Sequence, residues 1–142
     1  MLIEELMTRS PTTVTPSMTL AEAARKMKDG GVGSVVVADE DDVLGVLTDR
    51  DIALALAFPP EFDAESRVDQ VMTPRPVTIE AGVQVPEGLE KMRAHAIRRL
   101  VVVDSRGRLV GVVSLDDVLV HLGNTMEVVA DLVREEVAVK IP

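Results

Sequence analysis

A hydroxyl residue followed three positions later by an aspartate occurs twice in this sequence, each time after a short apolar stretch. Thr48 precedes Asp51 in the first copy, and Ser114 precedes Asp117 in the second. Apolar residues continue beyond each aspartate, so we expect a buried strand to run directly into a helix, with the hydroxyl residue at the junction. The free N–H groups and the dipole at a helix start favour negative charge. Each junction is therefore a candidate site for an anion.

The same spacing also has a purely structural explanation. A Ser or Thr followed at the third position by an acid forms a capping box, in which each side chain accepts a hydrogen bond from the other residue's backbone N–H. Thr19 and Glu22 show this pattern without a preceding strand, and there we expect only a cap. At the other two places a glycine, Gly45 or Gly111, opens the apolar stretch, and the whole arrangement is duplicated. These features favour a functional role over capping alone.

The composition restricts the classes of function. The 142 residues carry a net charge of −9, which argues against nucleic acid or an anionic membrane as a partner. The chain has no cysteine, so disulfides and thiolate metal sites are excluded. No apolar run reaches membrane-spanning length, and the N-terminus does not resemble a secretion signal, so we expect a cytoplasmic protein. Because the only aromatic residues are two Phe, a bound base would pack on aliphatic side chains or on an arginine plane.

Hydrophobic spacing and turn residues predict the elements that position the first motif. The expected elements are a short helix at 2–7, a strand at 12–15, a helix after Thr19, strands at 34–38 and 44–47, and a helix at 49–58. The acids at 39–42 indicate a solvated turn between those two strands. The buried face of the helix after Thr19 is expected to contain Leu20, Ala23, Ala24 and Met27.

The second half of the chain repeats this order. Thr78 falls 65 residues after Thr13, and Lys91 falls 65 residues after Lys26. The offset becomes 66 after one extra residue in the turn at 105–108. Two copies of a unit this long are typical of a pseudo-symmetric pair rather than a solenoid. Since each half is small for an independent core, we expect the halves to pack through their sheets.

The last part of the chain lies outside the duplication. Asn124 to Glu127 looks like a third capped helix start. Apolar residues follow at roughly helical spacing, namely Met126, Val129, Ala130, Val133 and Val137. We expect this helix to pack on the rest of the molecule or to form a dimer contact.

Taken together, these features resemble a pair of CBS domains, the repeat named after cystathionine beta-synthase, which is often called a Bateman module. The flanking segments match as well, with Leu6-Met7-Thr8 and Val71-Met72-Thr73-Pro74 before the repeats and Arg98 to Asp104 within the second. The resemblance implies a mixed fold, α+β or α/β, of two pseudo-symmetric β-α-β-β-α repeats. It places repeat 1 at 1–62, repeat 2 at 63–122 and a helical tail at 123–142.

The resemblance also implies a function. CBS pairs usually bind an adenosine-containing ligand in a cleft between the repeats: AMP, ADP or ATP, S-adenosylmethionine, or sometimes NAD(H). In the family each site is built crosswise from both repeats. The implied ribose ligands are Asp51 and Asp117. The implied phosphate ligands are Thr48, Ser114, Arg98, Arg99 and Arg50. The implied adenine contacts are Thr13, Gly33, Ser34, Val35, Thr78 and Ile97.

The two implied sites are not equivalent. The site of Asp51 would contain Arg98 and Arg99, whereas the site of Asp117 would contain Gly33 and Ser34 at the matching positions, with Asp116 added. A phosphate that enters a cleft without a cation loses hydration that neutral hydrogen bonds do not replace. We therefore predict that a nucleotide prefers the Asp51 site. Strand alternation predicts that one of the two arginines faces away from the cleft.

No other group of residues suggests chemistry. His95 and His121 are in neither a metal-ligand nor a triad spacing, and we expect them at the surface or at helix ends. We predict no catalytic residue and no resident metal, although Mg²⁺ could accompany ATP. The expected protein is a non-enzymatic nucleotide sensor, a homodimer that signals to an unknown regulated protein. The rival interpretations are a ligand-independent dimerising scaffold and an enzyme acting on the bound nucleotide.

Overall fold

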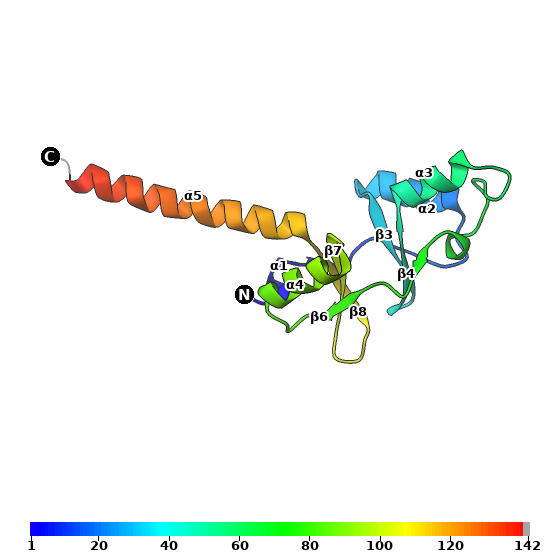
Figure 1. Ribbon diagram of the computed structural model, residues 1–142, viewed down its shortest axis with the longest axis horizontal. Helices are drawn as coiled ribbons and strands as arrows, with labels where there is room; N and C mark the ends of the chain where they lie inside the picture. The colour runs from blue at the N-terminus through cyan, green and yellow to red at the C-terminus, as the bar shows by residue number, and fades with distance from the viewer. Residues whose placement is uncertain (141–142) are drawn as a thin grey trace.

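Two four-stranded sheets form the centre of the molecule, with helices on their outer sides (Figure 1). The structure is a computed structural model that describes residues 1–140, with side chains through residue 136. In chain order the elements are α1 (Ile3–Leu6), β1 (Thr8–Arg9), β2 (Thr13–Val14), α2 (Leu20–Gly30), β3 (Ser34–Asp39), β4 (Asp42–Thr48), α3 (Asp49–Ala57), the 3-10 helix η1 (Val68–Gln70), β5 (Thr73–Pro74), β6 (Thr78–Glu80), α4 (Val85–His95), β7 (Arg99–Val103), β8 (Leu109–Ser114) and α5 (Leu115–Lys140).

The predicted strand–helix–strand–strand–helix order is confirmed in both halves. Parallel strands β2 and β3 flank α2, and parallel strands β6 and β7 flank α4. Thr19 and Glu22 form the expected capping box at the start of α2. Three of the four residues expected on the inner face of α2 are buried, but Ala24 is exposed because it lies at the edge of the stripe that the other three define.

The two shortest strands are exchanged between the halves. β1 precedes the first half in sequence but pairs antiparallel with β8, with Arg9 opposite Gly111. β5 precedes the second half but pairs antiparallel with β4, with Pro74 opposite Gly45. The sheet orders are therefore β1-β8-β7-β6 and β2-β3-β4-β5. Each half is completed by the segment that precedes the other one in the chain.

This exchange explains the two glycines of the repeated motif. A Cβ atom on Gly111 would lie 2.7 Å from the carbonyl oxygen of Thr8 and 2.7 Å from Sδ of Met7. A Cβ atom on Gly45 would lie 2.8 Å from the carbonyl oxygen of Thr73. Both distances are below van der Waals contact, so only glycine allows β1 and β5 to approach. The glycines therefore serve strand packing, and the candidate chemistry depends on the hydroxyl residues and aspartates.

The core consists of three buried clusters. One fills the space between α2, α3 and the first sheet, and a second fills the space between α1, α4 and the second sheet. The third lies between the sheets and is formed by Val36, Ala38, Val101 and Val103 with partly buried neighbours. The expectation that the halves pack through their sheets is therefore confirmed.

The last helix differs from the prediction. The sequence suggested a new helix start at Asn124, but α5 is continuous from Leu115 to Lys140 and runs away from the sheets (Figure 1). The capping pattern at 124–127 therefore lies inside a helix, where Asn124 is exposed and Thr125 Oγ1 donates to the carbonyl of His121 at 2.9 Å. Residues 141 and 142 of the expected tail lie outside the described residues. None of the helices in the described range is long and apolar enough to cross a bilayer.

Candidate ligand site at the two strand–helix junctions

The first junction joins β4 to α3. Thr48 is the last residue of β4, and its N–H donates to Oδ2 of Asp51 at 2.9 Å. In return, the N–H of Asp51 donates to Oγ1 of Thr48 at 3.0 Å. This reciprocal pair is partly buried and satisfies two N–H groups at the junction. It occupies Oδ2 of Asp51, while Oδ1 has no hydrogen-bond donor among the described residues.

The second junction, between β8 and α5, has the same geometry. The N–H of Ser114 donates to Oδ2 of Asp117 at 2.8 Å, and the N–H of Asp117 donates to Oγ of Ser114 at 3.1 Å. This pair is also partly buried. Capping therefore accounts for one oxygen of each aspartate. The other oxygen of each carboxylate remains a strong acceptor that a pair of hydroxyl groups could use.

Each junction lies beside the start of the neighbouring strand of its own half, β3 in the first half and β7 in the second. In the first half, Thr48 is opposite Ser34, and the N–H of Asp49 donates to the carbonyl of Gly33 at 2.9 Å. The Asp49 carboxylate lies against Gly33, because a Cβ atom there would be 3.1 Å from Oδ2 of Asp49. Asp49, which the sequence did not mark as a site residue, places a negative charge directly at the start of β3.

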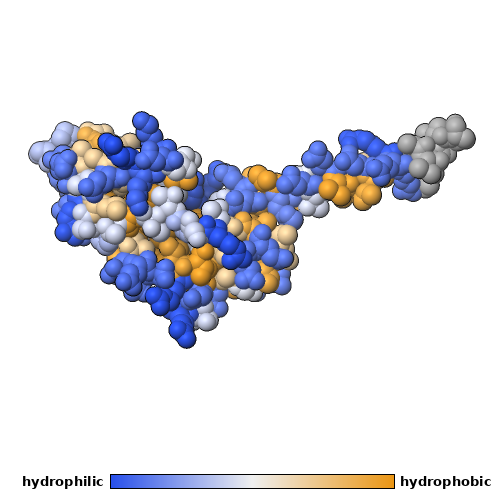
Figure 2. All heavy atoms as spheres, turned by 180° about the vertical axis from the view of Figure 1, so that it is seen from behind, coloured by the Kyte–Doolittle hydropathy of each residue, from blue (hydrophilic) through white to orange (hydrophobic). Residues whose placement is uncertain are grey.

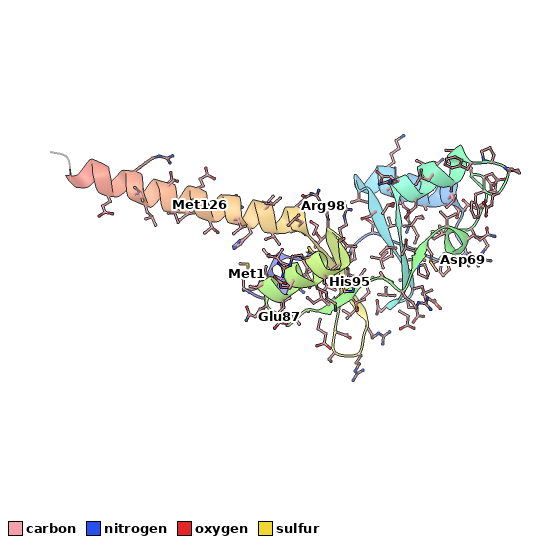
Figure 3. The ribbon with its side chains drawn as sticks, viewed as in Figure 1. Met1, Asp69, Glu87, His95, Arg98 and Met126 are labelled. Carbon is pink, nitrogen blue, oxygen red and sulfur yellow. The ribbon has the colours of Figure 1, made fainter. Side chains whose placement is uncertain are left out.

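In the second half, the start of the strand is cationic instead. Arg99 is opposite Ser114, and the N–H of Leu115 donates to the carbonyl of Arg98 at 2.8 Å. Both arginines are exposed. That one of them faces away from the cleft stays a prediction. Arg98 lies where α5 departs from the sheet (Figure 3). Arg50 is also exposed, on the first turn of α3.

Arg98 has a partner that the sequence did not suggest. Its Nη2 lies 3.1 Å from Oδ1 of Asp116, and the two side chains are 68% and 69% exposed. The sequence interpretation assigned these two residues to opposite sites. They meet because β7 and β8 are antiparallel neighbours, which brings the start of one beside the end of the other. An ion pair this exposed contributes little, so a phosphate could replace Asp116 as the partner of Arg98.

The residues implied to contact adenine occupy varied environments. Thr13 on β2 and Thr78 on β6 are partly buried, and each sits in the parallel strand beside β3 or β7. The side chain of Val35 is part of the first core cluster, so a base could contact only its backbone. Ile97 is partly buried and packs against the second core cluster. That these residues combine crosswise with the aspartate of the other half stays a prediction.

Two lysines support the strands of the implied adenine contacts. Nζ of Lys26 donates to the carbonyl of Thr13 at 3.0 Å, and Nζ of Lys91 donates to the carbonyl of Thr78. In the sequence these lysines are only markers of the repeat. Each lysine follows its threonine by 13 residues, and this equal spacing in both halves is the sequence feature that could have linked the lysines to these strands.

The turns at the far end of the two hairpins join the halves. The N–H of Leu109 donates to the carbonyl of Asp41 at 2.8 Å, and Nη2 of Arg108 lies 3.6 Å from Oδ2 of Asp41. The acids at 39–42 are exposed, as expected of a solvated turn. In the second of these turns, backbone N–H groups of Arg108 and Arg106 lower the pKa of Asp104 below its usual range. Within the described residues, no three His, Asp or Glu side chains form a metal-binding group.

The histidines do not enter either junction. His95 is the last residue of α4, is exposed, and its Nδ1 lies 3.0 Å from the carbonyl of Lys91 (Figure 3). The prediction of a surface position at a helix end is confirmed for this residue. His121 is partly buried. It lies inside α5 rather than at a helix end, because that helix continues past the expected end of the repeat.

Comparison with known proteins adds to this geometry. A sequence model of the CBS domain matches residues 3–58 and 68–124. An uncharacterized protein of Methanopyrus kandleri, MK0525, is 33% identical over 118 residues. That match covers 82% of this chain but only 60% of the relative's length.

Solved structures share the architecture. A CBS domain protein from Pyrobaculum aerophilum, PAE2072, complexed with AMP, has a TM-score of 0.75 and 31% identity, covering 82% of this chain and 89% of that one. The CBS domain pair of protein MJ0100, in complex with 5-methylthioadenosine and S-adenosyl-L-methionine, has a TM-score of 0.76 and 26% identity. It covers 88% of this chain and 98% of that one. Both of these similar structures contain adenosine derivatives.

Proposed function

Because this chain belongs to the CBS domain family, we propose that it is a non-enzymatic regulatory module that binds an adenosine-containing ligand between its two repeats. AMP, ADP and ATP are the favoured ligands, and Mg²⁺ would enter only as the counterion of ATP. The ligands of the two similar solved structures support the adenosine moiety, which AMP, 5-methylthioadenosine and S-adenosyl-L-methionine share.

The observation that carries the proposal is the second carboxylate oxygen at each junction. The capping box fixes Asp51 and Asp117 in one orientation through Oδ2 and leaves Oδ1 without a donor among the described residues. A carboxylate held in this way accepts hydrogen bonds from a ribose diol without first losing side-chain freedom. The hydroxyl of Thr48 or Ser114 and the helix start beside it suit a phosphate.

The charges around the junctions support unequal sites. The implied Asp51 site includes Arg98 and Arg99, which are both exposed, and Arg98 would exchange its exposed ion pair with Asp116 for a phosphate. The implied Asp117 site includes Gly33, and the Asp49 carboxylate lies against that glycine. The Asp49 carboxylate repels a phosphate, and this repulsion disfavours phosphate binding more strongly than the lack of a cation alone would. We propose that the nucleotide binds at Asp51, and that the Asp117 site prefers an adenosine derivative without phosphate.

Ligand binding would act by changing the balance between arrangements of the two repeats. A ligand that touches both repeats shifts their relative orientation only if it binds one arrangement more tightly than the other. We propose that a second copy and a separate regulated protein respond to this shift.

The test is calorimetric titration of the whole chain with AMP, ADP, ATP, S-adenosylmethionine and NADH. We expect Asp51→Ala to weaken nucleotide binding by at least about tenfold, the loss of roughly one charged hydrogen bond. Asp117→Ala should leave nucleotide binding almost unchanged. If no adenosine ligand produces heat with the wild-type chain, the sensor proposal is wrong.

A matched control separates binding from capping. Glu22→Ala removes the same kind of cap from α2, away from both junctions. It should destabilise the protein by about 1 kcal/mol, as Asp51→Ala should, without changing ligand affinity. Equal stability losses with no difference in binding would favour the ligand-independent scaffold. Conversion of ATP during incubation with the protein would instead support an enzyme.

A further inference from the structure

The distal part of α5 exposes an apolar surface that no other described residue covers. Only the base of the helix packs on the domain, where Val118 is buried, and from Leu122 to Glu136 every residue except Ala130 is exposed. Met126 lies on this projecting part in Figure 3, and hydrophobic side chains are visible along it in Figure 2. Six large apolar side chains, called here the apolar arc, are between 46% and 65% exposed, namely Leu122, Met126, Val128, Val129, Leu132 and Val133. An apolar surface of this extent marks an interaction site.

The apolar arc is too wide for a contact with one other helix. At about 100° per residue, its six side chains spread over roughly 160° of the helix circumference. A seam between two helices uses only residues that alternate by three and four positions, which here are Leu122, Met126, Val129 and Val133. Val128 and Leu132 lie beside that seam and would stay in water. An apolar face this wide is typical of a helix that lies in a groove between two others.

The rest of the circumference carries a row of acids, called here the acidic row. Glu127, Asp131 and Glu135 follow one another at intervals of four residues, outside the apolar arc. Like charges at this spacing repel one another and destabilise the helix. Nη1 of Arg134 lies 2.8 Å from Oδ1 of Asp131 and offsets that acid, but Glu127 and Glu135 have no cationic partner among the described residues. Because the acidic row runs beside the Val128 edge of the apolar arc, a partner that covers the arc brings its own side chains next to these acids.

We propose that the distal part of α5 docks into a groove of the regulated protein, formed by two helices with an apolar floor and with Lys or Arg along its edge. Such a groove covers the full width of the apolar arc, and its cations neutralise acids that α5 itself leaves unpaired. A second copy of α5 does not fit this description, because one helix is too narrow for the arc and would add another acidic row. A nucleic acid or an anionic membrane is disfavoured by the same acids.

The docking surface belongs to the same helix as the second ligand junction. α5 begins at Leu115, directly after Ser114, and Asp117 lies in its first turn. The helix extends for 26 residues, or about 39 Å, and so carries the apolar arc clear of both sheets. A protein docked there is attached to the element that holds the Asp117 carboxylate, to which the proposed function assigns a ribose. This link to the ligand rests on the proposed function, whereas the docking itself does not.

A synthetic helical hairpin supplies a groove of the stated chemistry as a probe. Its two helices carry Leu and Ile on the groove side and Lys along the edge, and a second hairpin has Glu in place of each Lys. Fluorescence anisotropy of each labelled hairpin, titrated with the whole chain, measures the affinity. We expect the Lys hairpin to bind at least about tenfold more tightly than the Glu hairpin, with a smaller difference at high salt. No binding of the Lys hairpin, or equal binding of both hairpins, would overturn the proposal.

Three variants at exposed positions of α5 test the surface itself. Met126→Glu and Val128→Glu each place a charge in the apolar arc and should weaken binding of the Lys hairpin at least about tenfold. Asn124→Glu is the matched control, because Asn124 is exposed on the acidic side of α5 and gains the same charge, so it should bind at least as tightly as the wild type.

Each remaining outcome contradicts a part of the proposal. If Val128→Glu binds like Asn124→Glu, the contact is a seam with one helix and the groove is wrong. If Met126→Glu also does so, α5 is not the docking surface. Neither experiment uses an adenosine ligand, so its failure leaves the adenosine proposal unaffected.

Discussion

The replacement of Gly111 by alanine tests the exchange of strands between the halves. A Cβ atom at this position would lie 2.7 Å from the carbonyl oxygen of Thr8 and 2.7 Å from Sδ of Met7. The Met7 side chain is flexible and can move aside. The Thr8 carbonyl belongs to the backbone of β1, which pairs with β8 at this point, so the strand itself has to shift.

The expected cost follows from this geometry. Forcing one extra methyl group into a packed site typically costs about 1–3 kcal/mol. For a domain of this size, each kcal/mol lowers Tm by about 3–4 °C, so we expect a Tm that is about 3–12 °C lower. Gly45→Ala should behave alike, because its Cβ atom would lie 2.8 Å from the carbonyl oxygen of Thr73.

Thermal and urea unfolding followed by circular dichroism measure these losses. Gly82→Ala is the control, because no atom lies within 4 Å of the added Cβ and its φ angle is not in the left-handed region. The double variant Met7→Ala/Gly111→Ala should not recover the loss, since the carbonyl contact persists. If Gly111→Ala unfolds like Gly82→Ala, or if Met7→Ala restores its stability, the close approach of β1 does not explain the glycine.

Three further predictions concern the ligand sites and α5. Asp116→Ala should strengthen AMP binding and Arg98→Ala should weaken it, because the first variant frees the guanidinium that the second removes. Each change should be about two- to tenfold and smaller at high salt. Calorimetry at two salt concentrations measures both affinities, and a change in the same direction for both variants would contradict a role for Arg98. Lys91→Met should weaken ligand binding with little change in Tm, because the support of the Thr78 carbonyl is lost while the aliphatic stem remains. Gly123→Ala should raise the free energy of unfolding by about 0.5–1 kcal/mol, since this glycine lies inside α5 with open space around it; a loss in urea unfolding would count against it.

The sequence by itself determined the order of the elements and the positions of the two junctions. Local chemistry was sufficient, because capping pairs such as Thr48–Asp51 and Thr19–Glu22 join residues three positions apart and fix where a helix begins. The duplication also specified two similar halves, and the β-branched runs specified strands buried between layers. These are all interactions among near neighbours or properties of periodic patterns.

The tertiary structure decided which segments complete each half. The pairing of β1 with β8 joins residues about a hundred positions apart, and no local pattern records such a contact. The reason for the motif glycines became apparent only with that strand in place. Similarly, Asp116 meets Arg98, and Asp49 meets Gly33, only because antiparallel strands bring distant ends together.

The continuity of α5 was also a tertiary outcome. Asn124 and Thr125 favour a helix start when judged locally, but a helix already anchored by Leu115 and Val118 in the second half continues through them at small cost. Propensity differences of a few tenths of a kcal/mol per residue do not end a helix that packing has nucleated. Short-range chemistry thus set the junctions of this protein, and long-range packing set which residues meet there.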